Sequence, residues 1–442
     1  MDEQIRVLRI RVSKLFDAIS YDIRLKDRQD IGIITAPNGK GKTTVLNLLA
    51  FLLSPSYLRF RAIRGIPFSR FDCTLSNGKC VSLRRIPAEA SRARGAGPGT
   101  EDAADCDFEL SVTPSDEKPV LFSGLLLEME KRQRSQELEE LMLLAEGRDN
   151  SQPAGRPVPP DDAFGGALRQ YLKRRGCAVP VVQIGADRLR PAAPDRGDAP
   201  GGRGAQAADP MEEACRQIGL ALRKARAEYN EEVAKAKDTL PRKFLENDGS
   251  LPPVDELRRR WKEYSEALDR YRAMGLVDAA PDFIREEDIP AWYESKGDFL
   301  RTYMDVFSNT TRALEDDYAK LNLFKQIFDE RNAVTGKTVR YTRDGIRIYS
   351  GDRPLNPSAL SSGEKHDFIM FYHLIFSTGP NSLILIDEPE ISLHIEWQES
   401  YIGHLARICG INRLQALIAT HSPHIISNHF DCLLDKGESH ED

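Results

Sequence analysis

The feature that most constrains this fold is a short turn that joins an apolar segment to a helix near the N-terminus. Residues 31–35 (IGIIT) are almost wholly apolar, and the turn that follows, APNGKGKT, contains two glycines. Apolar residues then recur at Val45, Leu46, Leu49 and Leu53, the spacing of one helix face. A buried strand that passes through such a turn into a helix indicates an α/β fold with a covered, mostly parallel sheet.

This turn matches a phosphate-binding loop. The pattern G-x-x-x-x-G-K-[ST] between a strand and a helix binds phosphates, and here Ala36 replaces the first glycine, which mainly eases the turn. Gly39 and Gly41 let backbone N–H groups converge on phosphate oxygens at the positive end of the helix. We expect Lys42 to reach the β- and γ-phosphates and the Thr43 hydroxyl to bind Mg²⁺. The alternative is a chance glycine-rich turn. The predicted nucleotide-binding residues are Pro37, Asn38, Gly39, Lys40, Gly41, Lys42, Thr43 and Thr44.

Two acidic residues end a second apolar segment. Residues 383–386 (LILI) are followed by Asp387 and Glu388. A buried central strand would deliver both carboxylates to the C-terminal edge of the sheet, where ligands bind. We expect Asp387 to bind Mg²⁺ and Glu388 to polarise the attacking water as general base. Apolar runs often end in acids by chance, so this pattern is informative only in combination with the phosphate-binding loop.

A third segment, LSSGE at residues 360–364, directly precedes a predicted helix. A serine hydroxyl and adjacent N–H groups at the start of a helix suit a γ-phosphate. The same residues also form an ordinary helix cap with an acid in the first turn, and this remains the alternative. The candidate site residues here are Ser361, Ser362, Gly363 and Glu364.

Together these motifs resemble those of the ABC-type ATPases. The LSGGQ signature of that family is matched with Ser362 for its first glycine and Glu364 for its glutamine. The resemblance implies that the signature acts in trans, so that a head-to-tail dimer holds two ATP molecules at its interface. Residues 389–394 stand in the D-loop position, and His421 resembles the switch histidine that touches the γ-phosphate, with a surface or core role as the alternative. Gln183 is a candidate Q-loop glutamine.

The spacing of the motifs indicates a split head. Lys42 and Ser361 lie 319 positions apart (361 minus 42). This long spacing is similar to that in the RecF, SMC and Rad50 branch of the family, where inserted helices separate the two halves of one head. The expected fold is an α/β ABC-type P-loop ATPase head, with a mixed β lobe and a parallel-sheet lobe, interrupted by a helical domain with a short coiled coil. The predicted parts are a first half of the head at 1–85, its continuation with an irregular insert and a helix at 121–145 within 86–189, a flexible linker at 190–210, the helical insertion at 211–335, and the second half of the head at 336–442.

The charge marks the insertion. Residues 211–330 carry 26 acidic and 20 basic side chains, whereas the rest of the chain carries 42 of each, so this stretch holds the whole net charge of −6. We expect its acidic surface to contact another subunit or a partner. Two helical seams lie within it, one at Leu257, Trp261, Tyr264, Leu268 and Tyr271 and one repeating every seven residues at Leu300, Phe307, Leu314 and Leu321. They predict a hairpin that packs on itself or, alternatively, a seam that also joins subunits.

Longer phrases narrow the resemblance. DEPEISLH and ATHSP are similar to the OLD-like ATPases of prokaryotic defence, and LSSGEKHDFIMFYHLIF and ATHSPHIISNHFD look most like the ATPase subunits (AriA) of PARIS anti-phage systems. The Septu ATPases (PtuA), paired with an HNH nuclease, are near neighbours. The resemblance implies an oligomeric sensor and scaffold that controls a separate Toprim nuclease and responds to a phage trigger protein. Only 21 residues follow His421, so no nuclease domain is expected here.

Composition excludes several other classes. The seven cysteines include no C-x-x-C pair, which disfavours a disulfide framework or a zinc finger. No run approaches the length of a membrane span, and the charged N-terminus is unlike a signal peptide, so a cytoplasmic protein is expected. Three functions remain: a defence ATPase, a DNA-binding repair ATPase of the RecF or SMC kind, and a scaffold that binds ATP but scarcely hydrolyses it.

Overall fold

The chain forms two compact units. The computed structural model describes residues 4–26, 29–35, 37, 39–87, 106–114, 118–122, 160–185, 209–246, 250–278, 284–343, 345–393 and 395–438. The first unit comprises Met1–Asp195 and Gly379–Asp442, and the second comprises Arg196–Thr378. The first unit is therefore built from both ends of the chain and interrupted once. The predicted helix beyond residue 122 and the predicted linker before residue 209 lie outside the described residues, and the predicted domain boundaries stay predictions.

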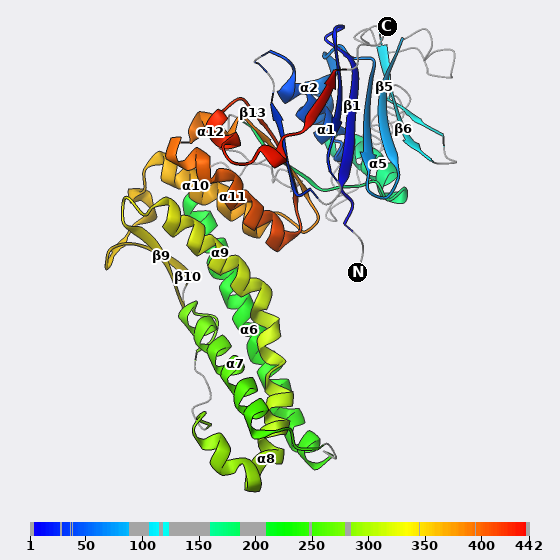
Figure 1. The fold of residues 1–442 in the computed structure, drawn as a ribbon. Helices are drawn as coiled ribbons and strands as arrows, with labels where there is room; N and C mark the ends of the chain where they lie inside the picture. Colours follow the sequence, from blue (N-terminus) through cyan, green and yellow to red (C-terminus); the bar gives the residue numbers. More distant parts are fainter. Residues whose placement is uncertain are drawn as a thin grey trace, which may run out of the picture. The chain divides into compact units, whose positions relative to one another are not determined.

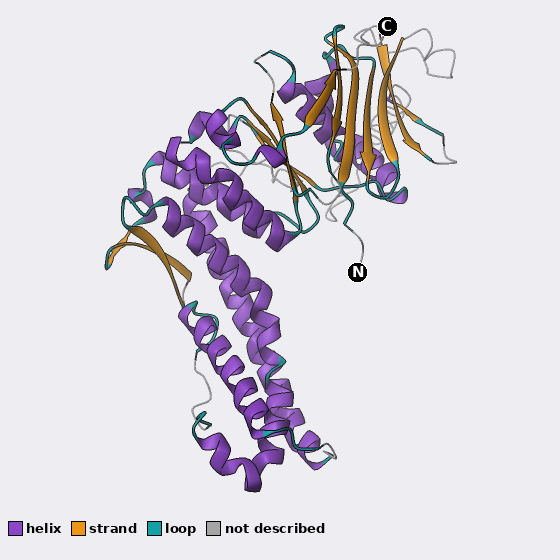
Figure 2. Ribbon diagram, viewed as in Figure 1, coloured by secondary structure: helices purple, strands orange, loops and turns teal. Residues whose placement is uncertain are grey.

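One sheet of the first unit is antiparallel throughout. Its strands lie in the order β14-β2-β1-β4-β5-β6-β7 (Figure 2). In β1, Val7 and Ile10 are fully buried whereas Leu8 is half-buried, because the register with β4 shifts between Val7 and Arg9. This bulge changes which side chains of β1 face the core. The strands are β1 (Val7–Leu15), β2 (Ile19–Arg24), β4 (Arg70–Leu75), β5 (Cys80–Pro87), β6 (Cys106–Thr113), β7 (Val120–Leu121) and β14 (Asp435–Glu438).

The second sheet of this unit is parallel. Its order is β3-β13-β12-β8, and the strands are β3 (Ile31–Thr35), β13 (Gln415–Thr420), β12 (Leu383–Asp387) and β8 (Val181–Ile184). All residues of the two central strands are buried, which explains their almost continuous apolar sequences.

Helix α1 (Lys42–Leu53) contacts strands of both sheets. Every residue of α1 from Val45 to Leu53 except Asn47 is buried, so buried side chains surround the whole helix. A helix that is apolar on all sides needs cover on all sides, and the two sheets provide it. The remaining helical segments of this unit are α2 (Tyr57–Arg64), α5 (Pro160–Arg174), η4 (Pro389–Ser392), α11 (Ile395–Asn412), α12 (Pro423–Ile426) and η5 (Phe430–Cys432).

The second unit is mainly helical (Figure 1). Helix α7 carries all five residues of the first predicted seam, and all five are buried. Helix α7 contacts α8, and the ring of Trp261 lies 6.4 Å from that of Tyr303. The seam therefore packs within the chain. The main helices are α6 (Pro210–Leu245), α7 (Val254–Ala273), α8 (Asp288–Phe307) and α9 (Glu315–Arg331).

The second predicted seam is interrupted. Its four residues are buried, but they are spread over α8, the 3₁₀ segment η1 (Thr310–Leu314) and α9. The Thr310 hydroxyl donates to the carbonyl of Phe307 at 2.8 Å, and that of Thr311 donates to Ser308 at 3.0 Å. Such side-chain bonds to the preceding turn compete with regular helix geometry, so the seven-residue repeat does not form one continuous coiled-coil helix.

A small sheet and a further helix complete the second unit. The sheet has the order β11-β10-β9, formed by β9 (Lys337–Thr342), β10 (Gly345–Ser350) and β11 (Arg353–Leu355). A 3₁₀ turn, η2 (Pro357–Ala359), leads to α10 (Ser362–Tyr372) and the π-helical turn η3 (His373–Ser377). A buried ion pair ties α9 to α10, with Arg331 Nη2 2.9 Å from Asp367 Oδ2.

Within the described residues, none of the helices combines the length and apolarity that crossing a membrane requires. The fold class agrees with the prediction, since antiparallel and parallel lobes share one head and helices interrupt it.

Candidate functional site

Three loops meet at one edge of the parallel sheet. In the register of the strands, Thr35 of β3 pairs with Thr420 of β13, and Ala419 pairs with Asp387 of β12. Because parallel strands end at the same edge, the phosphate-binding loop, the loop after Asp387 and the loop after Thr420 leave the sheet side by side. Strand β13 lies between the other two, so His421, which follows it, leaves the sheet between the loops that follow β3 and β12.

The phosphate-binding loop has the backbone that its glycines predict. Gly39 and Gly41 have φ values of +79° and +80°, in the left-handed region that glycine adopts readily. A Cβ at Gly41 would lie 2.7 Å from Leu15 Cδ2, whereas nothing lies within 4 Å of a Cβ at Gly39. The Tyr21 hydroxyl donates to the carbonyl of Lys40 at 2.7 Å and anchors the loop to β2. Ala36 and Asn38 lie outside the described residues.

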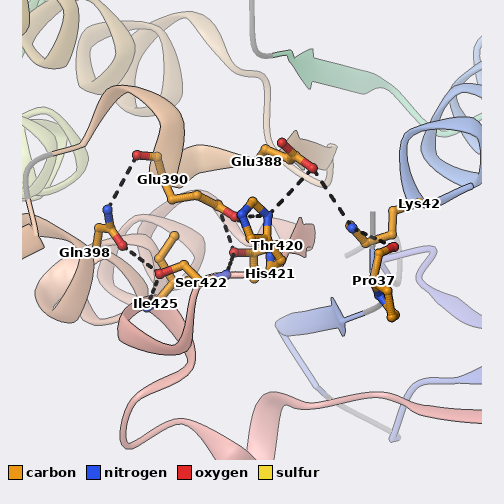
Figure 3. A network of polar contacts seen from close by, with 9 residues as sticks. All are labelled: Pro37, Lys42, Glu388, Glu390, Gln398, Thr420, His421, Ser422 and Ile425. Carbon is orange, nitrogen blue, oxygen red and sulfur yellow. Dashed lines mark hydrogen bonds and ion pairs between the residues drawn. The ribbon is translucent and has the colours of Figure 1, made fainter. Parts of the chain in front are cut away.

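The start of α1 favours an anion. Its first turn contains no acidic residue, and its N-cap, Gly41, has no side chain that could cap the N–H groups of that turn. Lys42 is buried, and its Nζ lies 3.4 Å from the carbonyl of Pro37 and 4.0 Å from Glu388 Oε1 (Figure 3). The open space beside Gly39, the uncapped N–H groups and this ammonium group fit the phosphates of a nucleotide.

The acidic pair at the end of β12 divides into a buried and an accessible carboxylate. Asp387 is 7% exposed, whereas the side chain of Glu388 is 24% exposed. Glu388 adopts a left-handed φ of +46°, and its N–H donates to the carbonyl of Ala419 at 2.8 Å. Non-glycine residues with such a φ are uncommon and cluster at functional sites. The turn directs Glu388 toward Lys42. The hydroxyl of Thr43 and the carboxylate of Asp387 are hard oxygen ligands of the kind that suits Mg²⁺.

His421 lies beside two glutamates. Its Nδ1 is 2.9 Å from Glu390 Oε1 and 3.8 Å from Glu388 Oε1 (Figure 3). Its backbone N–H donates to the same Glu390 oxygen at 3.0 Å, and the Thr420 hydroxyl donates to Glu390 Oε2 at 2.8 Å. The predicted Lys42, Glu388 and His421 are thus brought together, along with an acid for which no role was predicted.

No sequence pattern indicates the partners of Glu390. It follows Glu388 and Pro389 in the chain, but its contact with His421 spans 31 positions. A further polar layer continues the network. The Ser422 hydroxyl donates to Gln398 Oε1 at 2.6 Å, and Gln398 Nε2 donates to the carbonyl of Leu393 at 3.0 Å. No periodic pattern marks such contacts between loops, so only the folded chain identifies them.

Gln183, the candidate Q-loop residue, lies next to the end of β8. Its Nε2 donates to Asn47 Oδ1 on α1 at 2.6 Å. Its side chain is therefore engaged with the helix that follows the phosphate-binding loop, and its predicted role remains a prediction. His394 lies outside the described residues.

The signature segment lies in the second unit and begins α10. Ser361 is its N-cap, and Ser361 and Glu364 form a reciprocal capping box with bonds of 3.3 Å and 2.8 Å. Lys337 Nζ lies 2.7 Å from each oxygen of Glu364. Burial by itself raises the pKa of Glu364, but the bonds from Lys337 and Ser361 outweigh it and lower the pKa below its usual value of 4.5.

The helix-cap interpretation and the signature interpretation are therefore compatible. The carboxylate of Glu364 is used within the unit, whereas Ser361 and Ser362 lie exposed at the surface and Gly363 is half-buried. A Cβ at Gly363 would meet nothing within 4 Å. The capping box fixes the start of the helix and uses the N–H groups of Ser361 and Glu364.

Comparison with known proteins gives one family match. Residues 234–427 match a family described as "AAA domain, putative AbiEii toxin, Type IV TA system". This range covers the signature segment, Asp387, Glu388 and His421 but begins after the phosphate-binding loop. No curated protein matches the chain.

Two solved structures resemble the chain loosely. One is the Smc head domain of Pyrococcus furiosus with an extended coiled coil, bound to the C-terminal domain of ScpA, at 14% identity and a TM-score of 0.34, covering 98% of this chain and 96% of that one. The other is the Smc head domain of Pyrococcus yayanosii with a coiled coil and joint, at 13% identity and a TM-score of 0.32, covering 96% and 93%. The family match and the phosphate-binding loop support an AAA-type ATPase domain.

Proposed function

We propose that this protein binds ATP with Mg²⁺ and hydrolyses it to ADP and phosphate. The single observation that carries this proposal is the position of Glu388. Its carboxylate lies 4.0 Å from the ammonium group of Lys42 and 3.8 Å from His421 Nδ1, at the edge of the sheet where the phosphate-binding loop ends. An accessible carboxylate next to a phosphate-binding lysine is placed to act on a water molecule that attacks the γ-phosphate.

Each residue then has a defined task. The N–H groups from Gly39 onward bind the phosphates, and Lys42 neutralises the charge that develops between the β- and γ-phosphates. Thr43 and Asp387 would hold Mg²⁺, which when bound neutralises phosphate charge. Glu388 accepts a proton from the attacking water, and His421 contacts the γ-phosphate. Phosphoryl transfer of this kind depends on positioning and charge stabilisation rather than covalent catalysis.

We further propose that the signature segment acts on the nucleotide of a second copy. Ser361 and Ser362 are exposed at a rigidly capped helix start, as expected for a surface that meets another molecule. The first N–H groups of α10 would bind the γ-phosphate held by the partner subunit. A head-to-tail dimer follows, with two ATP molecules at its interface.

In the cell, we propose a cytoplasmic sensor and scaffold subunit of an anti-phage system that controls a separate Toprim nuclease. The resemblance of DEPEISLH and ATHSP to defence ATPases supports this role. A Septu-type ATPase with an HNH nuclease and a DNA-binding repair ATPase are the alternatives. DNA-stimulated hydrolysis with a steep dependence on salt would favour the repair ATPase, whereas ATP-dependent assembly without turnover would favour a scaffold that only binds ATP. A copurifying Toprim nuclease would favour the proposed system, and a copurifying HNH nuclease would favour the Septu-type system.

The change Glu388→Gln tests the assignment. It removes the base but keeps the size of the side chain, so ATP should still bind while turnover falls about 10²–10⁴-fold. The measurements are phosphate release and ATP affinity by calorimetry. Glu399→Gln is the matched control, because this glutamate is exposed on α11, and it should keep wild-type rates. Turnover at the wild-type rate in Glu388→Gln would overturn the assignment.

A further inference from the structure

Glu390 holds His421 at two points. Its side chain is only 9% exposed, and both of its carboxylate oxygens have partners. Oε1 accepts the backbone N–H of His421 at 3.0 Å and lies 2.9 Å from the ring Nδ1, while Oε2 accepts the Thr420 hydroxyl at 2.8 Å (Figure 3). One carboxylate therefore fixes the backbone and the ring of the same histidine.

This contact determines which ring nitrogen carries the proton. A carboxylate accepts hydrogen bonds, so the Nδ1 that faces Glu390 must be the protonated nitrogen. Nε2 is then directed away from Glu390. A histidine held in this way has one tautomer and one orientation, as histidines oriented by a buried carboxylate have in general.

The two glutamates next to His421 differ in their distances. Glu390 Oε1 is at hydrogen-bond distance from Nδ1, whereas Glu388 Oε1 is at 3.8 Å, which is too long for a hydrogen bond. Because Glu390 occupies Nδ1, the ring does not need Glu388.

We propose that Glu390 is a positioning residue that holds the Nδ1–H of His421, so that Nε2 faces the γ-phosphate and donates to it when the ring is protonated. This inference rests on the proposed ATP hydrolysis and assigns no proton transfer to Glu390. In its protonated form the ring would donate Nε2–H to a phosphate oxygen, with Glu390 balancing its charge.

The first experiment reads the tautomer directly. In protein with ¹⁵N-labelled histidine, the signals of His421 are identified by their loss in His421→Ala. At a pH where the ring is neutral, wild-type protein should show the Nδ1–H tautomer, and Glu390→Ala should shift the population toward Nε2–H. An unchanged tautomer in Glu390→Ala would overturn the proposal without reference to activity.

The second experiment is kinetic. Glu390→Ala should lower kcat about 10–100-fold with little change in KM, since removing a positioning contact costs about 1.5–3 kcal/mol. Glu390→Gln keeps the shape of the side chain and an oxygen acceptor in the same place, so its kcat should lie within about tenfold of wild type. In a His421→Ala background, Glu390→Ala should have no further effect. Additive losses in the double variant, or a Gln variant as impaired as the Ala variant, would contradict the proposed role.

The two proposals can fail separately. If Glu388→Gln keeps wild-type turnover, the hydrolysis assignment fails whatever Glu390 does. If Glu388→Gln abolishes turnover while Glu390→Ala keeps the wild-type kcat, hydrolysis stands and only the role of Glu390 fails.

Discussion

The carboxylate of Glu388 lies 4.0 Å from the ammonium group of Lys42, although 346 positions (388 minus 42) separate them in the chain. The two residues belong to opposite ends of the sequence and meet because β3 and β12 flank the same central strand, β13. Everything that the site can do depends on this closure of one unit from two distant segments of the chain.

Lys42→Ala should lower the affinity for ATP about 10–100-fold. On the proposed function, the change removes a charged hydrogen bond to phosphate worth about 1.5–3 kcal/mol, at a position where the side chain is buried beside the phosphate-binding loop. Titration calorimetry with ATP and Mg²⁺ measures the loss. Lys40→Ala is the control at an exposed neighbouring position, and its effect should be smaller. Equal affinities in wild type and Lys42→Ala would contradict the phosphate-binding role.

Gly41→Ala should destabilise the nucleotide-free protein more than Gly39→Ala. Both positions have a left-handed φ, which costs a non-glycine residue about 1–2 kcal/mol. Only at Gly41 would the added Cβ also clash, at 2.7 Å from Leu15 Cδ2, so this variant has a further cost that Gly39→Ala lacks. Thermal unfolding without nucleotide measures both, and a larger loss of stability at Gly39 would show that the loop packs differently.

Lys337→Met should destabilise the second unit by about 1–3 kcal/mol at pH 7, because the buried Glu364 loses the cation that contacts both its oxygens. Arg340→Met on the same strand is the control. Its partner, Asp352, is 98% exposed, so this pair should contribute almost nothing. Urea unfolding measures both variants, and equal effects would argue against a special role of Lys337.

The same ion pair has a defined pH dependence. The pKa of Glu364 is lower in the folded than in the unfolded chain, so its stabilising contribution is fully present above the usual value of 4.5. It is lost as the pH falls below that value and through the folded pKa. The acid-induced loss of stability in this window should therefore be smaller in Lys337→Met than in wild type, as seen in urea unfolding series from pH 6 downward. Parallel curves for the two proteins would exclude this contribution.

Trp261→Ala should destabilise the helical unit by about 3–5 kcal/mol. The indole is 6% exposed and packs between the rings of Tyr264 and Tyr303, so its removal leaves a large cavity. Trp292→Ala on α8 is the matched control, because this tryptophan is half-buried and should cost less. If the seam instead joined subunits, Trp261→Ala would change the oligomeric state measured by light scattering more than the free energy of unfolding.

Some parts of the site could be predicted from sequence because they are contiguous. The phosphate-binding loop needs two glycines and a lysine within a few positions, and the strand that ends in Asp387 needs only an apolar run before its acids. The backbone at Gly39 and Gly41, and the buried strand β12, agree with these expectations. Local chemistry determines such features before any distant contact forms.

Two other structural features could not be predicted from local sequence patterns. Leu8, Ile10 and Val12 alternate with arginines, a pattern that predicts three inward side chains. Leu8 is only half-buried, because a bulge shifts β1 against β4. The repeat through Leu300 and Leu321 crosses a 3₁₀ segment rather than one helix. In both cases a neighbouring element changes the local geometry that periodicity assumes.

The sequence by itself determined which groups are available: a loop that can hold phosphates, two acids at a strand end, and a histidine after the next strand. Only the tertiary structure decided which of them meet. Glu390 is the clearest case, since its two oxygens accept hydrogen bonds from Thr420 and His421, 30 and 31 positions away, and no pattern in the chain predicts these contacts. The physical reason is that periodicity and turn chemistry are local, whereas a buried carboxylate takes its partners from whichever loops the parallel sheet brings to one edge.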